Sequence, residues 1–316
     1  MIPFDRYTQT QLRYLTGGKT VSPILPYQDL PAELLKFNDN RGRLSLSGAQ
    51  SKFSVVVRGG KFCLTEPGEQ GTHILKPKLT HFVNAEASPA NEHLTMQIAS
   101  RVYGIETAGN ALCFFGNGEP AYVTRRYDIL PDGRKIQQED FASLAGITAD
   151  NYGGDYKYNA LSYEEIGGLI RKYIPAYPVE LVHFFDIILF NFLFSNGDAH
   201  LKNFSVLMTP EGDYRLAPAY DLINTRIHLP DDGIFALQKG LFADGRKFPV
   251  GIGGGHFLEF AGRIGISGKI AAGELERFRA DYPLVDKMVE ESLLPDSLKR
   301  VYLQSYYTRL RSFLRT

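Results

Sequence analysis

The sequence predicts an α+β protein with two lobes, a β-rich small lobe followed by an α-helical large lobe. Short apolar segments of strand-like composition, separated by glycine turns, fill the chain between residues 53 and 125. Longer apolar segments with helical periodicity follow from residue 138 onward. Strands that precede helices are typical of α+β folds, and 316 residues are many for one hydrophobic core. We therefore expect a small lobe over residues 1–128 and a large lobe over residues 129–316.

The composition argues against several classes of protein. Thirty-five basic and 35 acidic residues cancel, so no overall positive field attracts nucleic acid, and we expect no direct binding to it. Cys63 and Cys113 lie in strand-like apolar segments, which favours reduced, buried thiols over a disulfide. No signal segment opens the chain, and no apolar run reaches about 18 residues. These features predict a cytoplasmic protein that does not contact a membrane.

The first strand candidates form a hairpin. The segments FSVVVR and KFCLT are joined by Gly59-Gly60, a two-residue turn that suits a β-hairpin. The preceding loop, LSLSGAQSK, consists mainly of small residues, which let backbone N–H groups approach phosphate oxygens closely. Its one glycine is Gly48, so it is not a GxGxxG motif. An ordinary loop that leads into a strand is therefore the alternative interpretation.

A lysine and a glutamate follow in the next two elements. The strand candidate THILKP ends near Lys76, which could contact phosphates from a strand or could be an ordinary solvated residue. A helix is expected to begin with Ser88 as its N-cap and Pro89 at its first position. Glu92 falls in the expected first turn. It either pairs with Lys76 or simply favours the positive end of the helix.

Two further strands, at 111–115 and 121–125, are expected around a Gly116-Asn117-Gly118 turn. The second continues into TRRYDIL. We expect this segment to connect the lobes, where backbone groups could bind an adenine and Tyr127 could cover it.

The large lobe is expected to be helical from Gln138 onward. Its helix candidates are QQEDFASLAG, YEEIGGLIRKYI, VELVHFFDIILFNFLF and the amphipathic segment 293–314. The glycine-rich segment GIGGGH at 251–256 lacks the lysine and hydroxyl residue of a P-loop, so we interpret it as a mobile surface loop.

The chemistry is concentrated directly after the third of these helices. The chain breaks at Ser195-Asn196-Gly197, a turn signal, and a second isolated acid, Asp221, follows in PAYDL. The polar residues after the break are Asp198, His200, Lys202 and Asn203. An aspartate, then an asparagine five positions later, then a distant aspartate is the spacing of a kinase catalytic loop. Turn-forming loops are rich in both residue types, so the spacing alone could also arise by chance.

With these residues in view, the chain resembles the HipA-like serine/threonine kinases, the toxin components of bacterial toxin–antitoxin systems. The segments that carry the resemblance lie in the family's order between Leu44 and Asp221: SLSGAQSKF, THILKP, ANEHLTMQIA, RRYD, QQEDF, SNGDAHLKNFSV and PAYDL. Seven segments in series make the match specific. It implies a two-lobed protein-kinase-like fold that uses ATP and Mg²⁺.

The resemblance also implies roles for individual residues. Asp198 matches the family's catalytic aspartate, Asn203 and Asp221 match its magnesium ligands, and Lys76 matches its phosphate-binding lysine. We expect Lys202 to lie over the transferring phosphate and His200 to be a structural hydrogen-bonding residue at the nucleotide site rather than the base. The other residues expected around ATP are Ser47, Gly48, Ala49, Gln50, Arg125 and Tyr127. Arg125 replaces a glutamate of the family's long form, which leaves the adenine contacts open.

The chain resembles the short form of the family, HipT, because the long form carries a further subdomain before the small-residue loop. In the short form that subdomain is a separate HipS-like antitoxin, which acts with a HipB-like DNA-binding protein. The paired loop serines Ser45 and Ser47 are also similar to HipT, and the resemblance implies that they are autophosphorylated. The implied substrate is an aminoacyl-tRNA synthetase, with the tryptophanyl enzyme favoured.

Two other functions stay open at this point. A small-molecule kinase of the aminoglycoside or choline type shares the spacing of the catalytic loop, but it would need an acidic cleft, of which the balanced charge gives no sign. A catalytically silent kinase-like binding module would need none of the reactive side chains. Magnesium-dependent ATP turnover distinguishes this module from an enzyme.

Overall fold

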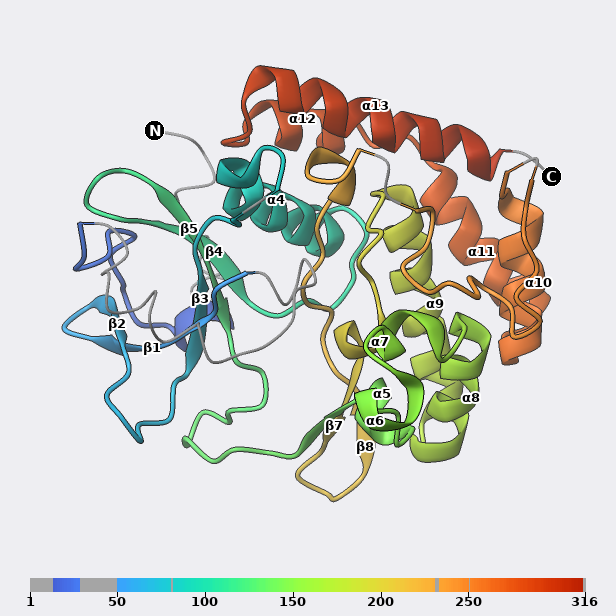
Figure 1. Ribbon diagram of the computed structural model, residues 1–316, viewed down its shortest axis with the longest axis horizontal. Coiled ribbons are helices and arrows are strands. Elements are labelled where there is room, and N and C mark those ends of the chain that lie inside the picture. Colours follow the sequence, from blue (N-terminus) through green and yellow to red (C-terminus); the bar gives the residue numbers. More distant parts are fainter. Residues whose placement is uncertain (1–13, 29–49, 81, 231–232, 250, 315–316) are drawn as a thin grey trace.

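The computed structural model describes residues 14–28, 50–80, 82–230, 233–249 and 251–314. It is a mixed α/β structure in which a curled β-sheet lies beside a larger helical region (Figure 1). The loop serines Ser45 and Ser47, together with Gly48 and Ala49, lie outside the described residues.

The large sheet is antiparallel and has the strand order β2-β1-β3-β5-β4. Its strands are β1 (Phe53–Arg58), β2 (Lys61–Leu64), β3 (His73–Lys76), β4 (Asn110–Phe114) and β5 (Pro120–Arg125). The expected turn between β1 and β2 is confirmed, since Gly59 and Gly60 have φ angles of 54° and 71°. Only glycine adopts two successive angles of this kind readily, and this is what a tight hairpin requires.

Helix α4 (Ser88–Arg101) packs against β4 and β5 and places its other side among the helices. The expectation that Ser88 is its N-cap was wrong. The short 3₁₀ turn η2 (Ala85–Ala87) precedes the helix and Ala87 occupies the cap. Ser88 instead joins two backbone groups, because its Oγ donates to the Ala85 carbonyl and accepts from Leu79 N, both at 2.8 Å. Glu92 therefore lies beyond the first turn.

A second sheet was not expected from the sequence. It has the order β6-β7-β8, formed by β6 (Gln138–Asp140), β7 (Ser205–Met208) and β8 (Tyr214–Leu216). The helix expected at QQEDFASLAG is thus only the single turn α5 (Phe141–Leu144). Glu139 pairs with Val206 across the sheet, and the Asp140 side chain caps α5. The partner strand follows more than sixty residues later, so no local pattern reveals it.

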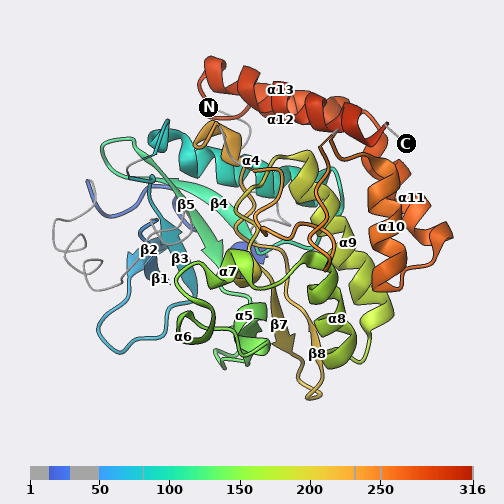
Figure 2. The same ribbon diagram turned by 45° about the vertical axis from the view of Figure 1, so that its right-hand side comes forward.

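The helical region is built around α9 (Tyr177–Leu193), which the sequence predicted as a core helix and which is buried along most of its length. Helices α8, α10, α11 and α13 pack on it, and in both views α13 lies along one side of the molecule (Figures 1 and 2). The α-helices of this region besides α5 and α9 are α6 (Ala149–Tyr152), α7 (Tyr156–Asn159), α8 (Tyr163–Tyr173), α10 (Gly254–Ile264), α11 (Gly268–Arg279), α12 (Pro283–Glu290) and α13 (Asp296–Phe313).

The interpretation of GIGGGH as a mobile surface loop was wrong, because the segment contains the first turn of α10. Gly254 is buried, and a Cβ added there would lie 2.7 Å from the Phe313 carbonyl oxygen. The glycine therefore permits close packing of α10 against the end of α13.

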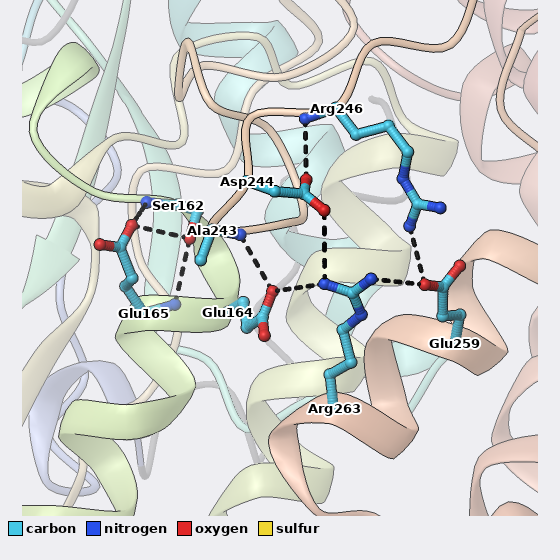
Figure 3. Close-up of polar contacts among 8 residues, drawn as sticks. All are labelled: Ser162, Glu164, Glu165, Ala243, Asp244, Arg246, Glu259 and Arg263. Carbon is cyan, nitrogen blue, oxygen red and sulfur yellow. Dashed lines mark hydrogen bonds and ion pairs between the residues drawn. The ribbon is translucent and has the colours of Figure 1, made fainter.

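Polar contacts fix the segment between β8 and α10 to the helices beneath it (Figure 3). Arg263 on α10 contacts Glu259, Glu164 and Asp244 at 2.8, 3.4 and 3.7 Å. Arg246 also bonds to Glu259, at 2.8 Å. These ion pairs are partly exposed, so each stabilises the fold only modestly.

Truncation of Phe194 is expected to cost about 3–5 kcal/mol of the free energy of unfolding, as for other large aromatic residues of a core. Phe194 is fully buried and stacks on Phe190 and Tyr306, with ring centroids at 4.4 and 5.1 Å. It therefore joins the end of α9 to α13. Urea unfolding of Phe194→Ala measures the loss. The exposed Val179→Ala on α9 is the control and should change stability by about 0.5 kcal/mol or less.

Candidate active site

A turn held by side-chain hydrogen bonds at the end of α9 positions Asp198. Ser195 has a φ of 53°, a left-handed conformation that is uncommon outside glycine. The Asn196 side chain donates to Asn191 Oδ1 at 2.9 Å and accepts from the Asp198 backbone N–H at 3.2 Å. The Gly197 N–H donates to Thr225 Oγ1 at 3.0 Å. Side chains from two separate segments thus hold this loop in one shape.

Asp198 lies at a small cavity of about 20 Å³, and Gln50, Lys76, Glu92 and Asp221 also line it. The Asp198 carboxylate accepts a hydrogen bond from the Tyr158 hydroxyl at 2.6 Å, which orients it. The structure therefore brings together residues from the small-residue loop, β3, α4, the catalytic loop and the PAYDL segment. Of these, Asp198 and Asp221 are 23 positions apart, whereas Lys76 and Asp221 are separated by 145.

Lys76 is the centre of a buried ion-pair chain. It is 2% exposed, its Nζ lies 2.5 Å from Glu92 Oε1, and it also contacts the Asp221 carboxylate. Asp221 in turn lies 3.3 Å from Lys52 Nζ, and Asn203 Nδ2 donates to it at 3.4 Å. The two interpretations of Glu92 are thereby separated, because its carboxylate pairs with the lysine from within α4.

Electrostatics keep Lys76 and Asp221 ionised, whereas burial raises the pKa of Glu92. Burial alone would lower the pKa of Lys76, but the charges of Asp221 and Glu92 outweigh it and raise that pKa. Burial alone would likewise raise the pKa of Asp221, but Lys52 and Lys76 hold it below its usual range. At neutral pH the site therefore presents a buried ammonium and a carboxylate.

Asn203 and Asp221 form a donor set suited to Mg²⁺, which prefers oxygen ligands and retains several from phosphates and water. Asp221 has a φ of 55°, and strained backbone of this kind in a residue other than glycine is concentrated at functional sites. Among the described residues, no group of three or more His, Cys, Asp or Glu side chains could hold a metal ion by itself. A metal here would thus depend on further ligands such as phosphate oxygens.

Three other predicted site residues make contacts outside the ion-pair chain. Gln50 Nε2 donates to the Pro77 carbonyl at 3.1 Å, next to Lys76. Lys202 Nζ pairs with Asp140 at 2.6 Å. The Tyr127 hydroxyl accepts from Gln138, and its ring lies 5.6 Å from that of Tyr220.

Arg125 and His200 do not join the ion-pair chain. Arg125 Nη1 donates to the Tyr14 carbonyl at 3.0 Å, at the N-terminal part of the described chain. His200 is 1% exposed and packs edge-on against Tyr158. Burial lowers the pKa of His200 to about 3, so it is neutral at pH 7.

Sequence reasoning missed Tyr158 and the roles of Asp140 and Tyr220. Tyr220 donates to the Lys202 carbonyl at 2.9 Å and shares a hydrogen bond with Ser205 at 2.6 Å. Tyr158 lies in a short helical turn forty positions before Asp198, and no spacing rule marks it. Tyr220 directly precedes Asp221 in PAYDL, and this position beside a predicted site residue was the only signal for it in the sequence.

Buried histidines predict that stability falls on acidification. Burial lowers the pKa values of His73, His93 and His200 from 6.5 to about 4, 3 and 3. Stability that is present above pH 6.5 is therefore lost as the pH falls towards 4, because the unfolded chain takes up the protons first. At pH 5 each imidazole should cost about 2 kcal/mol of unfolding free energy. Urea unfolding at pH 7.5 and 5 measures the loss, which His93→Gln should reduce.

The pKa of His183 shifts in the opposite direction, so a substitution there should have the opposite effect. Its hydrogen bond with Glu180 raises the pKa of His183, so its contribution is present below pH 6.5 and is lost at higher pH. His183→Gln should therefore enlarge the loss on acidification. An unchanged acid loss in His93→Gln would contradict the assignment of a neutral buried imidazole.

This site has the arrangement found in kinases. It combines a lysine on a strand, a glutamate on a helix, an aspartate in a loop and two side chains suited to bind a metal ion. The sequence pattern of the HipA-like C-terminal domain family matches residues 44–284. The chain therefore belongs to this family.

Individual relatives agree with this assignment. A Haemophilus influenzae protein named "Putative kinase" is 26% identical over 96% of this chain and 91% of its own length. "Putative kinase Y4mE" of Sinorhizobium fredii is 32% identical over 64% of the chain. The serine/threonine-protein kinase toxin HipA of Shewanella oneidensis is 28% identical over 76%. The chain spans only 47% of Y4mE and 59% of HipA.

Solved structures show the same fold. The Shewanella oneidensis HipA, in a complex with HipB and its operator DNA, has a TM-score of 0.69 at 23% identity. That match covers 90% of this chain and 67% of HipA. The Helicobacter pylori proinflammatory kinase CtkA has a TM-score of 0.54 at 14% identity, over 82% of this chain and 93% of its own. The expected kinase-like fold is thus confirmed. Within the described residues, no helix is long and apolar enough to span a membrane.

Proposed function

We propose that this protein is an ATP- and magnesium-dependent serine/threonine protein kinase that acts as the toxin of a bacterial toxin–antitoxin system. The observation that carries the proposal is the buried chain Glu92–Lys76–Asp221, which lies at the same small cavity as Asp198. Phosphoryl transfer needs aligned reactants and neutralised charge rather than covalent help, and these residues supply both.

Each residue has a distinct role in this proposal. Asn203 and Asp221 hold Mg²⁺, which supplies charge neutralisation at the ATP phosphates when it is bound. Lys76 keeps its positive charge because two carboxylates surround it, and it neutralises the phosphates from the small lobe. Asp198, oriented by Tyr158, accepts or orients the proton of the substrate hydroxyl.

Lys202 is the least direct of the proposed participants. Its Nζ pairs with Asp140, so it would have to leave this carboxylate to lie over a transferring phosphate. Lys52, which already contacts Asp221, is better placed to approach the phosphates.

The partners and substrate follow from family resemblance. The named toxin HipA and the complex of its structure with HipB and DNA support a toxin–antitoxin context. We propose that the chain is the short form, HipT-like, with a HipS-like antitoxin and a HipB-like partner, and that it phosphorylates an aminoacyl-tRNA synthetase. Autophosphorylation at Ser45 and Ser47 would weaken ATP binding, because a phosphate adds about −1.5 to −2 charges beside the nucleotide.

The test is addition of the purified chain and magnesium-ATP to a bacterial lysate, followed by mass spectrometry. The expected result is new phosphoserine or phosphothreonine on a small set of proteins, with an aminoacyl-tRNA synthetase among them, and phosphate on the chain's loop serines. Phosphate transfer to a small metabolite without any protein product would instead indicate a small-molecule kinase. Absence of magnesium-dependent ATP turnover would leave a binding module.

A further inference from the structure

A second cavity, of about 420 Å³, lies between α13 and the 3₁₀ turn η4 (Thr225–Ile227). We call it the α13 cavity. In Figure 1 the turn lies beneath α13, on the side of the helical region that also carries α4. The residues of the cavity used below are Ser195, Arg226, Pro230, Val301, Gln304 and Arg309. A volume of this size is typical of small-molecule sites.

Two arginines line this cavity, and within the described ranges neither has an acidic partner. Among the described residues, the Arg226 guanidinium donates to the Pro230 carbonyl through Nη1 at 2.7 Å, and the charged head of Arg309 lies 5.0 Å from the centre of the Phe192 ring. Within the described part of the chain, neither guanidinium forms an ion pair with a carboxylate. Two like charges side by side are unfavourable unless an anion offsets them.

The electrostatics of Arg309 agree with this picture. Burial, and then the nearby charge of Arg226, lower the pKa of Arg309 to about 10, which leaves it charged at neutral pH. Polar side chains surround the pair, since Gln304 also lines the cavity and Ser195 Oγ is buried without a partner among the described residues. Guanidinium groups with neighbouring hydroxyl and amide groups are the usual donor set for a tetrahedral phosphate.

Ser195 lines this cavity and also belongs to the turn that leads into the catalytic loop. Ser195 lies three positions before Asp198, and its carbonyl accepts hydrogen bonds from Thr225 N at 3.0 Å and Thr225 Oγ1 at 2.9 Å. The same Thr225 Oγ1 accepts from Gly197 N. Arg226 is the next residue. A group that moves Arg226 therefore acts on the bonded turn that places Asp198.

We propose that the α13 cavity binds a small phosphate monoester or free phosphate between Arg226 and Arg309, and that this ligand alters the rate of the catalytic site. Val301 and Pro230 add an apolar wall that would contact the organic part of a monoester. The regulatory half of this proposal rests on the proposed kinase function, whereas the binding half does not.

Isothermal titration of the full chain at low ionic strength tests the binding half, with inorganic phosphate and phenyl phosphate as separate probes. Arg309→Met and Arg226→Met should each weaken binding about tenfold or more, since each removes a charge-assisted bond. Arg309→Lys keeps the charge and should weaken it less. Arg311→Met, on an exposed arginine of the same helix, is the matched control and should bind as the wild type does. Tighter binding of phenyl phosphate would identify a monoester site, and equal binding a free-phosphate site.

The proposal is overturned if neither probe binds, or if Arg226→Met and Arg309→Met both bind as the wild type does. Equal weakening in Arg311→Met would show non-specific attraction to the basic helix and would also overturn it. Thermal unfolding of each variant, compared with wild type, identifies loss of the fold.

For the regulatory half, saturating phenyl phosphate should change kcat for ATP turnover in the wild type but not in Arg226→Met. An unchanged kcat would overturn that half alone, and absence of any turnover would count against the proposed function rather than the site.

Discussion

Asp198→Asn is expected to reduce phosphate transfer by about 10²- to 10⁴-fold, the range for loss of one positioned proton acceptor. Binding of magnesium-ATP should change little, because Lys76 and Asp221, which we propose to contact the nucleotide and its metal, pair with each other and not with Asp198. The amide keeps the size of the carboxylate and can still accept from the Tyr158 hydroxyl, so the loop should retain its shape. The measurement is the rate of phosphate transfer to protein, together with the dissociation constant of a non-hydrolysable ATP analogue.

Asp213→Asn is a suitable control, since Asp213 is an exposed residue of the turn between β7 and β8. It should leave both quantities unchanged. Near-normal transfer in Asp198→Asn would show that another group takes the proton. His200 would then be a poor candidate, because burial keeps its pKa near 3 and its ring is packed against Tyr158.

The parts of the fold that the sequence predicts well are those whose signals are local. The β1–β2 hairpin follows from two adjacent glycines, and α9 follows from an uninterrupted apolar run. Strand β6 was missed because its identity depends on pairing with β7, a partner more than sixty residues away. The start of α10 at Gly254 was missed for a related reason, since the packing of Phe313 against it cannot be read from GIGGGH itself.

The site shows the same division between local and distant signals. Asp198 and Asn203 lie in one loop, so their spacing in the sequence is enough to predict that they belong to the site. Spacing does not show that Lys76 contacts Asp221, whereas the fold places their side chains together. Nor does it show where a long side chain points, and Lys202 in fact reaches Asp140. Tyr158 was missed because a tyrosine in a short turn carries no sequence signal for the carboxylate that it contacts.

The ion-pair chain around Lys76 offsets the free-energy cost of burying this lysine. An ammonium that is 2% exposed would be strongly unfavourable alone, but Glu92 and Asp221 offset its charge. Removal of Lys76 would leave two carboxylates near each other in a buried setting and should cost about 3–5 kcal/mol of unfolding free energy. Substitutions at Asp221 are gentler, because Lys76 then keeps Glu92 as a partner. Asp221 is therefore the better position at which to test metal binding without loss of the fold.

Asp221→Asn is expected to weaken magnesium-ATP binding by about 100-fold or more, since it removes the charged oxygen ligand that Mg²⁺ prefers. Binding of ATP without magnesium should weaken far less, because the amide no longer repels phosphate and Lys76 stays charged beside Glu92. The two dissociation constants, measured with and without magnesium, separate loss of the metal ligand from general damage to the site. Asn203→Ala should reproduce the effect of Asp221→Asn, whereas the exposed Asp213→Asn should not. If Asp221→Asn bound magnesium-ATP as tightly as the wild type does, the metal would have to be held elsewhere, and the assignment of Asn203 and Asp221 as its ligands would be wrong.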